Sequence, residues 1–175
     1  MKKGYPAVPV FVFSSALVAA LFFNGCSAAK KSVRPPANAG NLSERQFRQE
    51  VVKYGLQLEG ASYKYAGADP RAGFDCSGFT SYVLKQFGVP VSPASSAQAA
   101  EGVPVSLNAV QPGDLIVFGK NKRNIQHVAM VVERSNKGIV VVHSTTSRGV
   151  IRENISTSAY WKPLILFARD VISGH

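Results

Sequence analysis

The residue best suited to chemistry in this 175-residue sequence is Cys76. Asp75 precedes it and apolar residues follow at spacings of four, which predicts a helix with Cys76 in its first turn. Unpaired backbone N–H groups and the helix dipole favour an anion there, so we expect a lowered thiol pKa and a nucleophile near neutral pH. The same N–H groups would hold a tetrahedral oxyanion. The alternative is a buried structural cysteine.

Two histidines are candidate partners of this thiol, because imidazole both stabilises a thiolate and protonates a leaving amine. His127 lies where a polar stretch meets an apolar run, and His143 ends the following apolar run. The alternative for each is a solvated side chain at the end of a strand. His175 stands at the terminus, and we assign it to solvent.

The turn between the two histidine-bearing strands decides whether the rings share a face, because side chains alternate along a strand. A loop over residues 134–138 would place residue 127 opposite residue 145 and make His143 a diagonal neighbour on the same face. A strict two-residue turn would put the rings on opposite faces unless a bulge intervenes. The sequence therefore predicts a longer loop or a bulge.

The elements that must position these residues are helices first and strands afterwards. Ser43 and Gln46 form a capping-box pattern ahead of apolar residues at helical spacing. A short helix is also expected near Ser95, where Gln98 would complete a second capping box. Apolar, β-branched runs predict strands at residues 115–118, 128–132, 139–142 and 164–168. This order favours an α+β domain over alternating βαβ units.

The N-terminal segment has the pattern of a bacterial lipoprotein signal: a positive start, an apolar stretch and a small residue before Cys26. We expect residues 1–25 to be removed, Cys26 to be lipidated, and residues 26–41 to tether a domain at residues 42–175. The protein would then lie on a membrane in the cell envelope, and Ser27 favours the outer membrane, facing the periplasm, if the cell has one. The alternative is an ordinary signal peptide with Cys26 free to oxidise.

Composition narrows the possible partners. There are 20 Lys+Arg against 10 Asp+Glu, a formal net charge of +10, which favours an acidic polymer such as cell wall. Nucleic acid is not expected, since an exported lipoprotein would rarely meet it and basic residues do not alternate with aromatic ones. Cys76 with two histidines supplies too few ligands for a structural zinc site once Cys26 is lipidated. We therefore expect no metal or cofactor. We also expect a monomer.

Several linked motifs carry a family resemblance. Their order is SYKYAG (residues 62–67), FDCSGF (74–79), QPGDL (111–115), HV (127–128) and His143. Together they resemble the NlpC family of cell-wall cysteine peptidases. Ser62, Ala66 and Ala129 depart from the residues that are usual in the family, and none of the three removes a reacting group.

The resemblance implies a papain-like fold, with N-terminal helices packed on an antiparallel sheet and a triad of Cys76, His127 and His143. It also implies cleavage of the amide between D-γ-glutamate and diaminopimelate or lysine in peptidoglycan stem peptides, through a thioester. Tyr63 is then a candidate to orient the thiol or the carbonyl. Asp75 and Ser77 are candidates to bind the free amine of the stem peptide, with helix capping as the alternative for Asp75.

Two other functions are compatible with the same residues. One is a wall-binding lipoprotein that keeps the pocket without turnover, although the intact triad residues weigh against it. The other is an amidase or acyltransferase that uses the same three side chains on a different bond.

Overall fold

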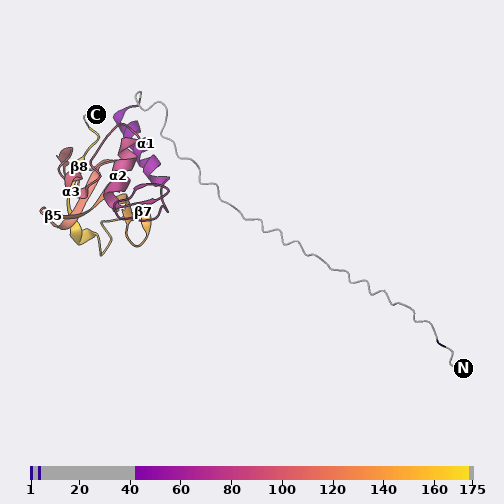
Figure 1. Cartoon of the computed structure of the whole chain (residues 1–175). Coiled ribbons are helices and arrows are strands. Elements are labelled where there is room, and N and C mark those ends of the chain that lie inside the picture. Colours follow the sequence, from indigo (N-terminus) through magenta and orange to yellow (C-terminus); the bar gives the residue numbers. More distant parts are fainter. Residues whose placement is uncertain (2–3, 5–41, 174–175) are drawn as a thin grey trace. The chain divides into compact units, whose positions relative to one another are not determined.

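The structure is a computed structural model that describes residues 1, 4 and 42–173 (Figure 1). The predicted signal peptide, the lipidation of Cys26 and the tether lie outside the described residues, apart from Met1 and Gly4, and so does His175. Within the described residues, no helix is long and apolar enough to cross a membrane.

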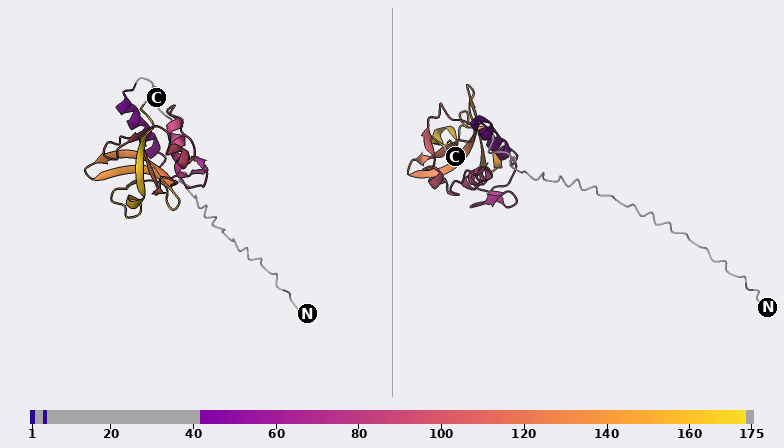
Figure 2. Two further views of the ribbon diagram at one scale, coloured as in Figure 1. Left: turned by 90° about the vertical axis from the view of Figure 1, so that its left-hand side faces the viewer. Right: turned by 90° about the horizontal axis from the view of Figure 1, so that it is seen from above.

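A six-stranded antiparallel sheet forms the centre of the domain, in the order β3-β8-β4-β5-β6-β7 (Figures 1 and 2). Its strands are β3 (Val103–Val105), β4 (Leu115–Asn121), β5 (Asn124–Ser135), β6 (Gly138–Thr145), β7 (Gly149–Asn154) and β8 (Ile165–Asp170). A separate small hairpin pairs β1 (Ala68–Asp69) with β2 (Gly73–Phe74). The predicted α+β class, with helices packed on an antiparallel sheet, is confirmed.

Three α-helices precede most of the sheet in sequence: α1 (Glu44–Leu56), α2 (Cys76–Lys85) and α3 (Ser95–Gln98). The capping box that was predicted at the start of α1 is present, because Ser43 and Gln46 bond to each other's backbone N–H. The capping box predicted for α3 is wrong. Its N-cap is Ala94, and the buried Gln98 amide instead bonds to Thr80 and to backbone carbonyls.

Alternating side chains give the sheet two apolar faces. On one face, Leu115, Met130 and Val142 pack with residues of α1 and α2. On the other face, a second cluster of strand residues packs around Trp161, which precedes the short 3-10 helix η2 (Lys162–Leu164). The sheet is therefore covered by side chains on both faces. This packing holds in place the strands that carry His127 and His143.

Of the two predicted alternatives, a longer loop or a bulge, the β5–β6 hairpin has the bulge. The turn itself is tight, since Ser135 pairs with Gly138, but Val131 pairs with Val141 and Glu133 with Val140. Val132 is the extra residue, and it shifts the register by one. Met130 therefore pairs with Val142, which places His127 and His143 on the same face of the sheet.

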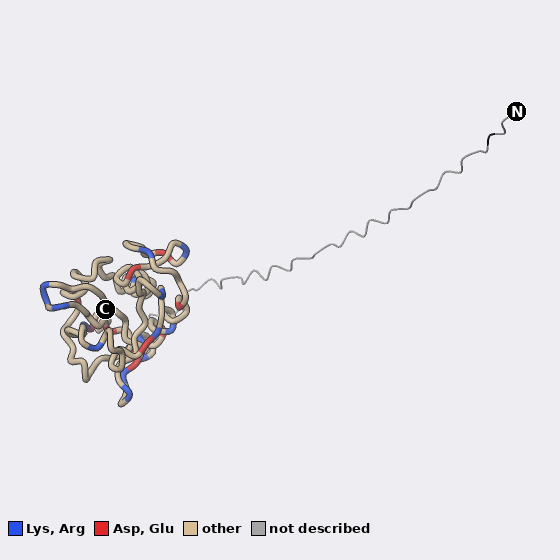
Figure 3. Tube along the Cα trace, turned by 90° about the horizontal axis from the view of Figure 1, so that it is seen from below, with Lys and Arg blue, Asp and Glu red and all other residues tan. Residues whose placement is uncertain are grey.

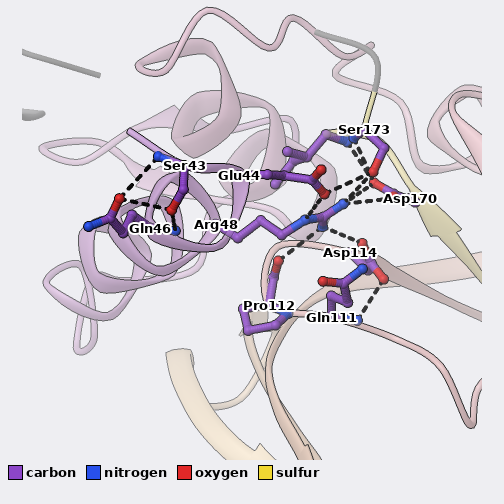
Figure 4. Close-up of polar contacts among 10 residues, drawn as sticks. Ser43, Glu44, Gln46, Arg48, Gln111, Pro112, Asp114, Asp170 and Ser173 are labelled. Carbon is purple, nitrogen blue, oxygen red and sulfur yellow. Dashed lines mark hydrogen bonds and ion pairs between the residues drawn. The ribbon is translucent and has the colours of Figure 1, made fainter. Parts of the chain in front are cut away.

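A buried arginine, Arg48, joins α1 to the turn before β4 and to the end of β8 (Figure 4). Arg48 donates 2.8 Å hydrogen bonds to Asp114, beside β4, and to Asp170, at the end of β8. It also reaches the Pro112 carbonyl, Ser173 and Glu44. Figure 3 shows Lys and Arg at several loop tips, whereas Arg48 is 1% exposed and is the only buried Lys or Arg in the described ranges.

The pKa values of Asp114 and Asp170, the two aspartates of this network, are shifted in opposite directions. Burial raises the pKa of Asp114 to about 6, although bonds from the Gln111 N–H and Arg48 oppose the shift. Burial also acts on Asp170, but hydrogen bonds from Arg48, Ser173 and two backbone N–H groups hold its pKa well below the usual range. Asp114 accepts from the Gln111 N–H across the turn before β4 and also ties that turn to α1.

Candidate active site

A pocket of about 600 Å³ opens where the start of α2 meets β5 and β6. Cys76 and His127 both line it. The remaining lining residues are Tyr63, Phe118, Gln126, Ser144, Thr145, Thr146, Ser147, Arg148, Glu153, Ser158, Tyr160, Trp161 and Leu164. The thiol and one imidazole are thus brought from distant parts of the sequence to one water-accessible space.

Cys76 is the first residue of α2, as the sequence predicts. Asp75 is the N-cap, and its Oδ1 accepts from the Gly78 N–H at 2.6 Å and from the Ser77 hydroxyl at 3.1 Å. A Cβ at position 78 would overlap the carbonyl oxygen of Gly67, so only glycine lets this loop pack on the helix. The cap and this contact together hold Cys76 in place at the pocket.

The expected low thiol pKa is wrong. Burial raises the pKa of Cys76, and the charge of Asp75 adds to this effect. The backbone N–H groups of Val128, Ser77 and Cys76 oppose the shift without cancelling it. The sequence argument counted the helix N-terminus but not the loss of water around the sulfur.

His127 and His143 are adjacent and buried. The Nε2 atom of His127 lies 2.9 Å from Nδ1 of His143, and the two side chains are 9% and 0% exposed. Burial lowers the pKa of His127 well below its usual value, and the neighbouring His143 lowers it further. Burial also lowers the pKa of His143. Both rings are therefore neutral at pH 7, and each carries one ring proton.

The chain of polar contacts continues past His143 to a carboxylate on β7. Nε2 of His143 lies 2.9 Å from Oε1 of Glu153. The same oxygen accepts from Arg148 at 2.8 Å and from the Trp161 indole at 3.0 Å. Trp161 also stacks on His127, with ring centroids 4.5 Å apart and planes inclined by 28°. One indole ring therefore contacts both the first imidazole and the final carboxylate.

The sequence analysis missed Glu153 and Trp161. Neither lies in a motif, and β7 lacks the long apolar run by which the other strands were predicted. A usable signal was present, since Gly149 begins a short segment that follows His143 closely enough to form a hairpin with its strand. Pairing that hairpin places Glu153 beside His143.

The three predicted substrate-binding residues are placed differently. Tyr63 lines the pocket, and burial raises the pKa of its phenol, so the hydroxyl keeps its proton. Asp75 does not line the pocket, but its charge acts on both Tyr63 and Cys76. Ser77 is 5% exposed and its hydroxyl is bonded to Asp75, so it lies behind the pocket wall.

The described residues contain no group of three or more His, Cys, Asp or Glu arranged to hold a metal ion. Cys76 is a free thiol. The arrangement therefore offers a neutral thiol, a neutral imidazole in the same pocket, and a second imidazole linked to a carboxylate. These groups suit nucleophilic attack with proton transfer to His127.

Comparison with known proteins identifies the family to which this fold belongs. The model of the NlpC/P60 family matches residues 60–169, which is more than half of the chain. This protein therefore belongs to the NlpC/P60 family.

Among its relatives, "Probable endopeptidase NlpC" of Escherichia coli (strain K12) is 32% identical over 162 residues, which cover 91% of this chain and 99% of that protein. "Gamma-DL-glutamyl hydrolase" of Bacillus subtilis (strain 168) is 32% identical over 141 residues, 78% of this chain and 33% of that protein. The chain thus spans about a third of the length of the B. subtilis relative.

A crystal structure of an NlpC/P60 family protein from Bacillus cereus ATCC 10987 has the same fold. It superposes with a TM-score of 0.64 and 27% sequence identity, over 82% of this chain and 43% of that one. The catalytic domain that was expected at residues 42–175 contains the matched segment.

Proposed function

We propose that this protein is a peptidoglycan endopeptidase that hydrolyses the amide between D-γ-glutamate and diaminopimelate, or lysine, in stem peptides. The observation that carries the proposal is the placement of Cys76 and His127 on one pocket, with His143 in contact with His127. Family membership and the name of the B. subtilis relative, a γ-glutamyl hydrolase, support the choice of bond.

In the proposed mechanism, the Cys76 sulfur attacks the γ-glutamyl carbonyl while His127 takes the thiol proton. Proton transfer accompanies the attack, since the thiol and the imidazole are both neutral in the free protein. Backbone N–H groups at the first turn of α2 stabilise the oxyanion. His127 then gives the proton to the departing amine, and a water that it activates hydrolyses the thioester and restores Cys76.

Substrate recognition is assigned to groups around the thiol. Tyr63 keeps its proton and would donate to the carbonyl or orient the sulfur. Asp75 acts through its charge on the free amine of the stem peptide, and Ser77 holds that carboxylate in place. Arg148 lines the pocket with its side chain 55% exposed, and so would pair with a carboxylate of the substrate.

Digestion of defined muropeptides, followed by mass spectrometry, tests this function. We expect products that end in D-glutamate, and none from the Cys76→Ala variant. Cleavage at another bond would contradict the substrate while leaving the thiol mechanism intact. Undiminished cleavage by Cys76→Ala would contradict the enzyme itself.

We also propose that Cys26 is lipidated after removal of residues 1–25, so that residues 26–41 tether the catalytic domain to a membrane of the cell envelope. The sequence pattern before Cys26 supports this location. Palmitate labelling in a bacterial host is expected to mark the wild type and Cys76→Ser equally. Label that persisted in Cys26→Ser would contradict the assignment.

A further inference from the structure

The polar chain behind the pocket crosses three neighbouring strands on one face of the sheet. His127 lies on β5, His143 on β6 and Glu153 on β7. In the β6–β7 ladder His143 pairs with Ile151, and Val141 pairs with Glu153. Glu153 is therefore a diagonal neighbour of His143, and the sheet itself brings their side chains together.

The Oε1 atom of Glu153 has three polar partners, and each of them is a hydrogen-bond donor or is a ring nitrogen that donates when it is protonated. Arg148 and the Trp161 indole can only donate, at 2.8 and 3.0 Å. His143 Nε2, at 2.9 Å, is the third group. A carboxylate can only accept, so this contact is a hydrogen bond only if His143 carries its proton on Nε2.

From this contact we infer that Glu153 is a positioning residue that fixes which nitrogen of each imidazole carries the proton. The inference rests on the proposed function for its effect on catalysis. With its single proton on Nε2, His143 has a lone pair on Nδ1. That lone pair faces Nε2 of His127, which must then donate across the 2.9 Å contact. His127 is left with a lone pair on Nδ1, which is free to take the Cys76 proton.

The charge of Glu153 has a second consequence once His127 has taken that proton. The imidazolium then donates to His143, whose other nitrogen is bonded to a carboxylate, so the new positive charge lies one ring away from a negative one. Glu153 is only 19% exposed at its side chain, which limits screening by water. The carboxylate of Glu153 thus stabilises the positive charge that forms on His127 when it takes the Cys76 proton.

Nitrogen-15 NMR of the imidazoles tests the proton arrangement directly. In the wild type we expect both His127 and His143 to be protonated on Nε2. Glu153→Ala should give a mixture in which His143 is partly protonated on Nδ1. Glu59→Gln is the matched control, because it removes a surface carboxylate that pairs with Arg152 at 3.5 Å. It should leave the wild-type pattern unchanged.

Kinetics on the muropeptide substrate separate positioning from charge. Glu153→Ala should lower kcat about 10- to 100-fold with KM within about twofold. Glu153→Gln keeps an oxygen acceptor for all three donors but loses the charge. It should retain the wild-type tautomers, lower kcat less, and move the acid limb of the pH profile to lower pH, since the Glu153 charge raises the pKa of His143.

A wild-type protonation pattern in Glu153→Ala, or an unshifted acid limb in Glu153→Gln, would overturn the inference. If Glu153→Ala does not fold, the Gln variant decides alone. If the wild type cleaves no muropeptide, the proposed function fails, but the NMR comparison still decides the proton arrangement.

Discussion

Two buried polar networks in this domain use similar groups for different ends. In one, Arg48 is surrounded by Asp114, Asp170 and Glu44, and its guanidinium has partners on every side. In the other, Glu153 contacts Arg148, Trp161 and His143. His143 in turn contacts His127, which lines the same pocket as Cys76. The first network connects elements of the fold to each other, whereas the second connects the fold to an open pocket.

The difference lies in where each network ends. The Arg48 contacts end in α1, the turn before β4 and the end of β8, so their loss separates parts of the structure. The second chain ends at His127, which lines the same pocket as the Cys76 thiol, and at an arginine that is 55% exposed. Its two imidazoles are neutral and can exchange protons. We therefore expect the first network to control stability and the second to control turnover.

The largest effect should come from the pocket end of the second network. Cys76→Ser replaces the thiol by a poor nucleophile, and we expect kcat/KM to fall by at least about 10³-fold. The free energy of unfolding should change by less than about 1 kcal/mol, since size and capping are preserved. Steady-state kinetics and urea unfolding of the same preparation measure both. A large loss of stability would remove the distinction between the networks.

Arg48→Met tests the opposite case. It leaves Asp114 buried without its cation, and we expect a loss of about 3–5 kcal/mol in the free energy of unfolding. Activity per folded molecule should stay within about twofold of the wild type. Arg45→Met is the matched control, because Arg45 is an exposed residue of the same helix and should cost less than about 0.5 kcal/mol.

A double variant sharpens this result. Asp114→Asn added to Arg48→Met removes one of the two buried carboxylate charges that lose their cation, the other being Asp170, and should recover part of the lost stability. Equal stability of Arg48→Met and Arg45→Met would show that the buried ion pairs contribute nothing to the fold.

Local features beside both networks were predictable from sequence. The Ser43 cap and the Asp75 cap each depend on residues within three positions, so a short pattern identifies them. The bulge in β5 was predictable once the two histidines were required to share a face, because strand parity demands one when the turn is short. The caps depend on spacing alone, which the sequence contains.

The remaining features depend on burial and on pairing between distant segments. The sequence gave no sign that Arg48 would bond to Asp114, which lies 66 residues away. The contact between Glu153 and His143 needs the register of β7, whose apolar pattern is weak. The raised thiol pKa arises because packing removes part of the water around the partly buried Cys76, which spacing does not reveal.

The smallest predicted effect concerns the free energy of unfolding. When the pH falls from about 7 to about 5, the two networks should change it in opposite directions. The pKa of Asp114 is raised to about 6, above its unfolded value of about 3.9, so the folded state binds more protons in this range and stability rises. The pKa of His127 is lowered below its unfolded value of about 6.5, so the unfolded state binds more protons and stability falls. Asp170 contributes no slope here, because its stabilisation is lost only as the pH falls below about 4.

Difference measurements isolate the two contributions, each on the order of 1 kcal/mol. Relative to the wild type, Asp114→Asn should lose stability on acidification, since it lacks the group that takes up a proton on folding. His127→Gln should gain stability on the same change, since it lacks the imidazole that must stay neutral. Urea unfolding at about pH 7 and about pH 5 measures both. Shifts of the same sign would mean that the two networks do not differ in their protonation on folding, and that only their end points distinguish them.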